Sequence, residues 1–324
     1  MTQNEVRIIS NRQIQQCGIS PADCIQWVEE SFRLKHEAQL PAKVSVHPRE
    51  DDFFTTMPAL LPARFGCFGV KVVSRIEGGK PALKSDILLY ESQTGRLLAI
   101  VDGDWITAMR TGAVAALAIQ TLKSSQAKTY SLMGLGNIAR AVVRCLLADE
   151  KEPQVRFRLL NYKDQAEQLM AAFADEKRAV FEVVDQMEDF VAGASVLISC
   201  ITAAGSRLLC PDDCLYQKGV LVVPVHTKGF QNCDLTFDKV FGDDTAHVSG
   251  FKYFSQFRQY AELGSVLLGK HPGRESDEER ILSYNVGLGL HDVLFAKKIY
   301  DRLTASDPEG PSFIQEREDQ KYWI

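Results

Sequence analysis

The chain has 324 residues, 45% of them hydrophobic and 24% charged, a composition typical of a globular protein long enough for two domains. Its net charge of −5 gives no electrostatic attraction to nucleic acid or to an anionic membrane surface. No apolar run reaches the roughly 20 residues that a membrane helix needs, and no signal peptide is expected at the first residues. The eight cysteines form no C-x-x-C pair, so we expect reduced thiols, no metal site and a cytoplasmic location.

The first third of the chain predicts a mixed α+β domain. A helix is expected over 26–40, where apolar residues recur at helical spacing after a start signal at Ser20 and Pro21. Strands are expected within 65–79 and 81–103, which alternate or are β-branched and are separated by glycine-containing turns. Strands joined by such short turns favour an antiparallel sheet.

An alanine-rich helix is expected over 104–122, and the polar joint 123–128 marks a domain boundary. Beyond the joint, apolar strands alternate with helices, which indicates βαβ units and a parallel sheet. The expected strands are 129–134, 155–161, 196–201 and 220–225, and the expected helices are 137–150 and 163–177. The predicted fold class is therefore α/β, with a parallel-sheet domain beside the mixed domain.

A glycine turn lies between the strand at 129–134 and the helix that opens at Asn137. Its pattern is Gly134-x-Gly136-x-x-Ala139. The first glycine suits a tight turn, the second allows a pyrophosphate to approach the backbone, and the small third residue lets the helix pack close to the strand. The strand–turn–helix context favours a dinucleotide site; the alternative is a plain strand–helix corner.

The end of the second parallel strand bears on the choice between NAD and NADP. An acidic residue there would accept a hydrogen bond from the ribose 2′-hydroxyl of NAD, but this chain has Asn161, Tyr162 and Lys163. A lysine can pair with a 2′-phosphate, so NADP is favoured over NAD; the alternative for Lys163 is a solvated helix start. The expected cofactor-binding residues are Gly134, Gly136, Asn137, Ala139, Asn161, Lys163 and Thr202.

At this point the chain resembles the ornithine cyclodeaminase/mu-crystallin family. The segments that carry the resemblance run through nearly the whole chain in the family's order, with the glycine turn between the third and the fourth. They are MPAL (57–60), GVKVVS (69–74), DGDWITAMRTGAVAALA (102–118), ELGSVLLGKHPGR (262–274) and VGLGLHDVLFAKKIY (286–300). The family includes a cyclodeaminase, alanine dehydrogenases, cyclic-imine reductases and carrier-like crystallins, so the resemblance does not select one activity.

The resemblance implies a domain organisation. Residues 1–122 and 301–324 would form a substrate-binding and dimerising domain, and residues 123–300 would form a Rossmann-type domain. The active site would lie between the two domains. The protein would be a homodimer, and its ligand would be a small amino or imino acid.

The resemblance also implies substrate-binding residues. Arg110, in I-T-x-x-R-T, matches the arginine that binds the substrate carboxylate in the family. A guanidinium suits a carboxylate because the two groups can form a bidentate pair of hydrogen bonds. The alternative is an ordinary surface arginine. Thr111 is its neighbour in the motif, and Lys43 falls where the family often carries a second arginine. Lys71, in G-V-K-V-V-S, matches the active-site lysine; a lysine inside a strand otherwise extends to an edge.

One departure from the family pattern concerns the stretch VPVHTKGFQNCDLTFD (223–238). The cyclodeaminase subgroup has an aspartate there that handles the substrate amine, whereas this chain places Lys228 at that position and His226 at a glycine position. Two unit charges of the same sign about 4 Å apart cost a few kcal/mol near a protein surface, so Lys228 disfavours ornithine. Lys228 would favour a substrate with an additional anionic group, or it would act as an acid. Alternatively, Lys228 points away from the substrate or contacts a cofactor phosphate.

The predicted function is an NAD(P)-dependent oxidoreductase acting on an α-imino or α-keto/amino acid. Arg110 and Lys43 would hold the carboxylate, and Lys71 would polarise or protonate the imine or carbonyl, with His226 or Lys228 as a second acid–base group. Two alternatives remain open at this point. One is ornithine cyclodeaminase, which converts ornithine to proline and ammonia with NAD, and the other is a dinucleotide-bound, crystallin-like carrier.

Overall fold

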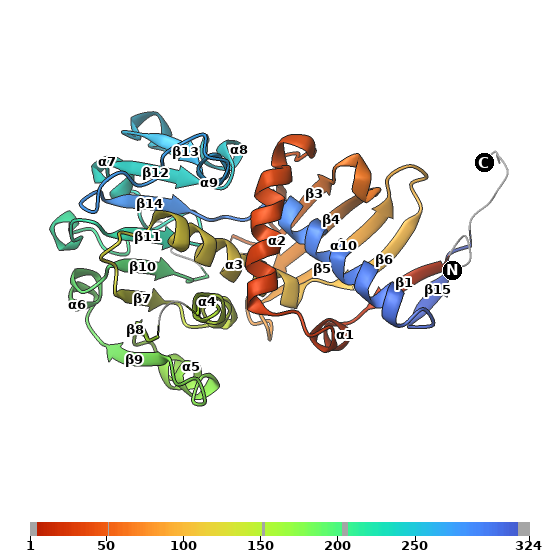
Figure 1. Cartoon of the computed structure of the whole chain (residues 1–324), viewed down its shortest axis with the longest axis horizontal. Coiled ribbons are helices and arrows are strands. Elements are labelled where there is room, and N and C mark those ends of the chain that lie inside the picture. The colour runs from red at the N-terminus through yellow and green to blue at the C-terminus, as the bar shows by residue number, and fades with distance from the viewer. Residues whose placement is uncertain (1–4, 51, 151–152, 203–206, 317–324) are drawn as a thin grey trace. The chain divides into compact units, whose positions relative to one another are not determined.

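The chain forms two compact units in the computed structural model, which describes residues 5–50, 52–150, 153–202 and 207–316 (Figure 1). Unit 1 comprises the described residues of Met1–Ser20, Leu34–Thr107 and Leu288–Ile324, and unit 2 comprises those of Pro21–Arg33 and Ala108–Gly287. No helix among the described residues is long and apolar enough to cross a membrane.

Unit 1 is built on a seven-stranded mixed sheet. Its strand order is β15-β1-β6-β5-β4-β3-β2, with every neighbouring pair antiparallel except β1 and β6. The strands are β1 (Glu5–Ile9), β2 (Val44–Val46), β3 (Phe53–Leu60), β4 (Cys67–Arg75), β5 (Leu83–Glu91), β6 (Leu97–Asp102) and β15 (Ser312–Ile314). The expected antiparallel pairing of the first third is thus confirmed for the meander from β3 to β6.

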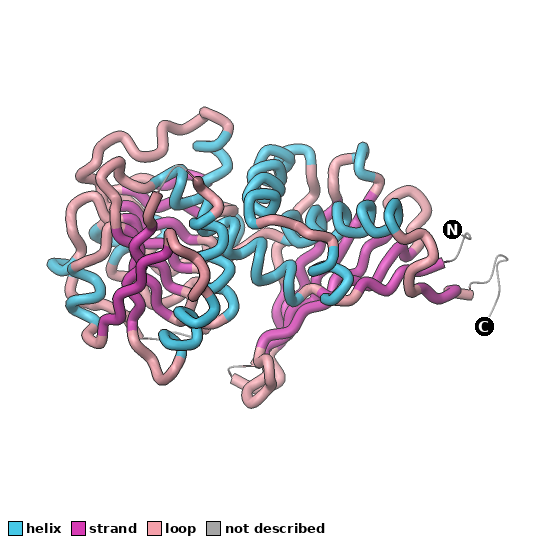
Figure 2. The backbone as a smooth tube through the Cα atoms, turned by 60° about the horizontal axis from the view of Figure 1, so that its bottom comes forward, coloured by secondary structure: helices cyan, strands magenta, loops and turns pink. Residues whose placement is uncertain are grey.

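Helix α10 (Gly289–Ser306) covers one face of this sheet, as Figures 1 and 2 both show. Residues of β4 alternate between the two faces, so Gly69 and Lys71 lie on the buried face together. The helix approaches closely because Gly69 has no side chain: a Cβ there would lie 2.8 Å from Val293. The remaining short helices of unit 1 are α1 (Asn11–Gln16), η1 (Lys35–Glu37) and η2 (Ala63–Phe65).

Unit 2 is built on an eight-stranded sheet in which every neighbouring pair of strands is parallel. Its order is β13-β12-β14-β11-β10-β7-β8-β9. The strands are β7 (Thr129–Met133), β8 (Val155–Leu160), β9 (Ala179–Val184), β10 (Val196–Ser199), β11 (Leu221–Pro224), β12 (Lys239–Gly242), β13 (Tyr260–Glu262) and β14 (Ile281–Tyr284). The order reverses between β7 and β10, and ligands of such sheets bind at the carboxyl ends of the strands beside that point.

Two long helices that precede the parallel sheet in sequence also contribute to unit 2. Helix α3 (Asp104–Leu122) starts in unit 1 and continues into unit 2, and α2 (Pro21–Leu34) lies in unit 2 for all but its last residue. The others are α4 (Asn137–Leu147), α5 (Gln165–Ala172), α6 (Met187–Ala192), η3 (Asp213–Leu215), α7 (Cys233–Thr236), α8 (Thr245–Val248), η4 (Phe254–Gln256) and α9 (Leu263–Leu267).

The α/β fold class, with a parallel sheet and a separate mixed sheet, is confirmed, but two details differ from expectation. The helix expected over 26–40 is α2, which starts at Pro21 and ends at Leu34, because Gln39 pairs in an extended conformation with Leu60. The units also divide within α3 and before α10 rather than at residues 122 and 300. The reason is packing: the later part of α3 contacts α4, while α10 contacts β3, β4 and β5 along the sheet of unit 1.

Candidate functional site

The glycine turn lies at the carboxyl end of β7, beside the point where the strand order reverses. Gly134 has φ of +73°, and a Cβ there would lie 2.5 Å from the backbone nitrogen of Ile201, so only glycine fits. Gly136 caps α4, is exposed, and has open space where a Cβ would be. Asn137 is exposed at the first helical position, and Ala139 is buried. An open glycine before the first N–H groups of a helix fits a pyrophosphate.

The end of β8 carries the three residues expected to decide between NAD and NADP. Asn161, Tyr162 and Lys163 are all exposed. The Asn161 Nδ2 donates a hydrogen bond of 2.8 Å to Oδ1 of Asp185, which directly follows β9. Lys163 has φ of +54°, a conformation that is uncommon outside glycine, and its Nζ lies 5.1 Å from the centre of the Tyr162 ring. An exposed cation and a carboxylate therefore both lie at this edge of the sheet.

Two polar residues meet at the carboxyl ends of β10 and β11. The Oγ of Ser199, the last residue of β10, is 2.7 Å from Nε2 of His226. Burial lowers the pKa of His226 to about 4, and a hydrogen bond to the backbone of Lys228 offsets only part of this effect. The imidazole is therefore neutral near pH 7. Thr202, expected to contact the cofactor, is exposed three residues after Ser199.

Lys228 lies in the loop after β11, at the same edge of the sheet as the glycine turn. Its side chain is exposed. The loop around it is fastened by Gln231, whose Oε1 accepts from the Gly229 backbone and whose Nε2 donates to the Thr227 carbonyl. The lysine thus sits on an ordered loop with its charge in solvent.

Arg110 lies on α3 and belongs to the same unit as the glycine turn. It is 5% exposed, and its neighbour Thr111 is 4% exposed, so Arg110 is not an ordinary surface arginine. Two residues further on, Gly112 allows α3 to contact the backbone of α4, since a Cβ there would lie 2.6 Å from the carbonyl carbon of Ala141. The helix that bears the arginine therefore packs directly against the helix that begins at the glycine turn.

Lys71 lies at the centre of β4 in unit 1 and faces α10. Its Nζ is 2.8 Å from Oδ2 of Asp292 in the first turn of that helix, and both side chains are completely buried. Lys43 is also in unit 1, half-buried, one residue before β2. Unit 2 thus holds Arg110, Thr111, His226, Lys228 and the expected cofactor residues, whereas unit 1 holds Lys71 and Lys43.

Four residues were not expected from the sequence: Asp185, Ser199, Asp292 and Asp243, which directly follows β12 and is completely buried. Asp292 lies within the segment 286–300 that carries part of the family resemblance, which was a usable signal. The other three stand directly after, or at the end of, parallel strands. The end of a parallel strand marks a candidate site residue only when the strand itself has been located. The strands β9 and β12, which precede Asp185 and Asp243, were not expected.

The chain belongs to the ornithine cyclodeaminase/mu-crystallin family, whose model matches residues 6–307. Among curated proteins it is similar to the nodulation efficiency protein NfeD of Rhizobium meliloti, at 25% identity over 91% of this chain and 95% of that protein. It is also similar to a Delta(1)-pyrroline-2-carboxylate reductase of Bacillus cereus, at 27% identity over 72% of this chain and 77% of the relative.

The fold is shared with a solved structure. The Delta(1)-pyrroline-2-carboxylate reductase of Thermococcus litoralis, in complex with NADH and L-proline, superimposes with a TM-score of 0.82. The superposition covers 92% of this chain and 98% of that one, at 21% identity. The two-unit architecture and the parallel sheet are therefore shared with that structure.

Proposed function

We propose that this protein is an NAD(P)-dependent oxidoreductase that acts on an α-imino or α-keto/amino acid. The observation that carries the proposal is the packing of α3 on α4. As a result, the buried guanidinium of Arg110 belongs to the same unit as a glycine turn that fits a dinucleotide. A bound dinucleotide supplies or accepts the hydride, and an arginine that holds a carboxylate orients the carbon next to it.

The relatives support a small imino or amino acid as the substrate class. Delta(1)-pyrroline-2-carboxylate is a cyclic imine with a carboxylate on the imine carbon, and the solved relative holds L-proline, the corresponding amine. A guanidinium that is nearly removed from solvent binds such a carboxylate more strongly than an exposed one does.

Four of the expected site residues have the following proposed roles. Arg110 binds the α-carboxylate through paired hydrogen bonds, and Lys43 adds a second positive charge. Lys71 is the proton donor to the imine nitrogen or carbonyl oxygen, because the neighbouring Asp292 carboxylate favours its protonated form. His226 is held neutral and orients the loop that bears Lys228.

We propose NADP as the preferred cofactor. Lys163 provides an exposed cation at the end of β8, and no carboxylate follows that strand directly. The nearby Asp185 follows β9 instead and accepts the hydrogen bond from Asn161. Titration of NADPH and NADH, followed by nicotinamide fluorescence, tests this preference. Lys163→Glu should weaken NADPH binding about tenfold and leave NADH binding within about twofold. Equal affinities of the unchanged protein for NADPH and NADH would contradict the preference for NADP.

We also propose a homodimer formed through the face of the unit 1 sheet opposite α10. Five apolar residues form one row across five strands on that face: Ile8, Ile100, Leu88, Val70 and Pro58. Ile8 is 44% exposed, and such a row is a surface that a second sheet can cover. Light scattering should give twice the 36.2 kDa of one chain, and Val70→Glu should give the monomer. A monomeric unchanged protein would contradict this.

A cytoplasmic location is proposed as well. All eight cysteines are free thiols, which suits a reducing compartment.

The function is tested by steady-state kinetics of Arg110→Ala. Because a charge-assisted pair contributes about 1.5–3 kcal/mol, KM for the keto or imino acid should rise at least about tenfold. The dissociation constant of NADPH should stay within about twofold, since the glycine turn is unchanged. An unchanged KM in a folded variant would show that the arginine is structural.

A further inference from the structure

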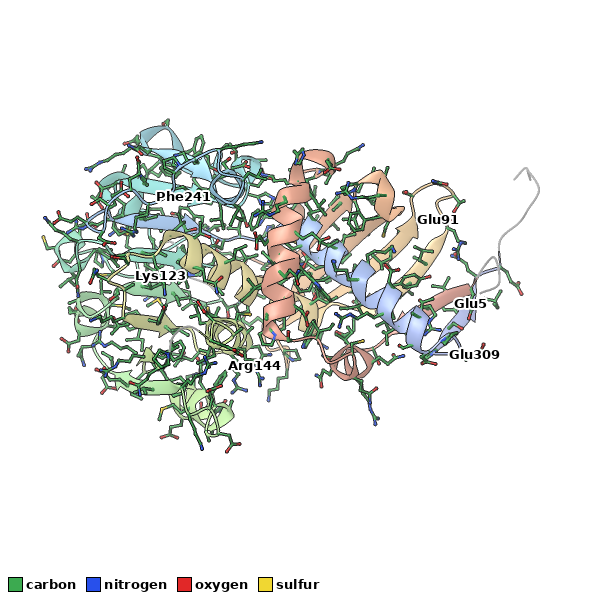
Figure 3. The ribbon with its side chains drawn as sticks, in the orientation of Figure 1. Glu5, Glu91, Lys123, Arg144, Phe241 and Glu309 are labelled. Atoms are coloured by element: carbon green, nitrogen blue, oxygen red, sulfur yellow. The ribbon has the colours of Figure 1, made fainter. Side chains whose placement is uncertain are left out.

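The connector between β14 and α10 contains a glycine that is fixed by two independent contacts. Gly287 has φ of +83°, which favours glycine whatever the surroundings. Its backbone N–H donates a short hydrogen bond to Oδ2 of Asp243. Asp243 directly follows β12, the strand paired with β14, in the part of the parallel sheet where Phe241 is labelled in Figure 3.

The second contact of Gly287 is with Arg110. The space that a Cβ of Gly287 would fill is occupied by the guanidinium of Arg110, with its Nη1 and Cζ nearest. The arginine therefore lies directly against the glycine Cα. Any side chain at position 287 would displace the guanidinium or the connector.

Asp243 is completely buried, although its charge is costly to bury. Oδ2 accepts the Gly287 N–H, while Oδ1 lies 3.9 Å from Nδ1 of His247 on α8. A buried carboxylate needs hydrogen bonds to offset its desolvation. The hydrogen bond from the Gly287 N–H ties Asp243 to the left-handed turn against which Arg110 rests.

We infer that Asp243 and Gly287 position the Arg110 guanidinium, so that the connector 285–288 sets how the site binds a substrate carboxylate. Asp243 is a positioning residue that acts through the Gly287 backbone. Gly287 contributes because its missing side chain leaves space for the Arg110 guanidinium. The part of this inference that concerns the substrate rests on the proposed function. The part that concerns the arginine does not.

The kinetic test uses Gly287→Ala and Asp243→Ala, each made in the unchanged protein and in Arg110→Ala. The matched controls are Gly250→Ala, whose Cβ meets open space, and Asp244→Asn, which keeps the cap of α8. Both test variants should raise KM for the keto or imino acid at least about tenfold, with NADPH affinity within about twofold and both controls unchanged. In the Arg110→Ala background the same changes should add almost nothing to KM.

A structural role without positioning would give a different result. Equal effects on KM with and without Arg110, or an unchanged KM in the folded variants, would overturn the inference. If Gly287→Ala does not fold, Asp243→Ala in both backgrounds decides the matter alone.

A second readout is independent of turnover. In protein labelled with ¹⁵N-arginine, the Nε–H signal that disappears in Arg110→Lys belongs to Arg110. It should shift or broaden in Asp243→Ala and stay in place in Asp244→Asn; an unmoved signal would overturn the positioning. If the unchanged protein oxidises no NAD(P)H with any substrate but the signal moves as expected, the proposed function fails while the positioning stands.

Discussion

The Nζ of Lys71 on β4 lies 2.8 Å from Oδ2 of Asp292 on α10, and neither side chain has any exposed surface. The two residues are far apart in sequence and are brought together because α10 packs on the face of the sheet that Lys71 shares with Gly69. The charge of a buried lysine is costly to remove from water, and the adjacent carboxylate offsets that cost. The pair links the stability of unit 1 to the proposed proton donor.

Lys71→Met should destabilise the protein strongly, because it leaves the Asp292 carboxylate buried without its partner. The expected loss is about 3–5 kcal/mol, measured by urea unfolding. Lys71→Met combined with Asp292→Asn removes both charges and should regain most of that loss. The control is Lys297→Met on the same helix, whose partner Asp301 is exposed, with an expected change below about 1 kcal/mol. A single Lys71→Met variant as stable as the control would contradict the account.

Features of the fold and the site that depend on contiguous residues could be predicted from the sequence, and features that depend on distant contacts could not. The glycine turn at 134–139 could be predicted because its three small residues, the strand before it and the helix after it are contiguous. Arg110 could be singled out only through the resemblance of its motif. Its position against Gly287 and its membership of unit 2 depend on packing between distant segments, which no local pattern encodes.

The partners of the predicted residues could not be predicted for the same reason. Asp292 is a carboxylate in the first turn of a helix, a common place for one, and nothing local pairs it with Lys71. The strands β12, β13 and β14 have only three or four residues each, too few for an alternating pattern to be distinct from a loop. Asp243, which directly follows β12, therefore gave no signal.

His226 should titrate far below the ordinary range of a histidine. Its pKa is lowered to about 4 by burial, so it stays neutral throughout the range in which the enzyme would work. An NMR titration of the imidazole carbons, assigned with His226→Gln, should show its midpoint near pH 4. A midpoint near 6.5, the ordinary value, would contradict the account and restore His226 as a candidate acid.

Asp234 should make the protein less stable as the pH rises. Burial raises its pKa to about 7, with Tyr284 donating a 2.8 Å hydrogen bond that opposes part of the shift. The unfolded chain releases this proton near pH 4 and the folded chain near pH 7, so stability falls between these values and then stays level. About three pKa units at 1.36 kcal/mol each give a loss on the order of 4 kcal/mol.

Asp234→Asn removes this titration while keeping an acceptor for the Tyr284 hydroxyl. The variant should therefore have the higher Tm at pH 8, with the difference shrinking toward pH 4. Tyr284→Phe should extend the loss of stability to higher pH without changing the pH at which it begins, because it removes the hydrogen bond that favours the folded-state carboxylate. A Tm difference for Asp234→Asn that does not vary with pH would show that Asp234 is not protonated in the folded state.

Lys228→Asp should change which substrates are preferred if the lysine contacts the substrate. A cation at this position favours an additional anionic group, so the charge reversal should shift the ratio of kcat/KM between dianionic and ornithine-like substrates by more than about tenfold. Lys218→Asp, at an exposed lysine paired with Glu278, is the control and should leave the ratio unchanged. A flat substrate profile for Lys228→Asp would show that the lysine does not select an anion, and the cyclodeaminase activity would regain support.

The most direct test of the central claim is the absorbance of the reduced nicotinamide during incubation with candidate substrates. The protein is mixed with NADPH or NADH and, in turn, with cyclic imino acids, α-keto acids with an amine, and ornithine. We predict net oxidation of the cofactor with an imino or keto acid, with an equal amount of the amino acid formed. Conversion of ornithine without net change in the cofactor, or tight binding of the cofactor with no turnover of any substrate, would contradict it.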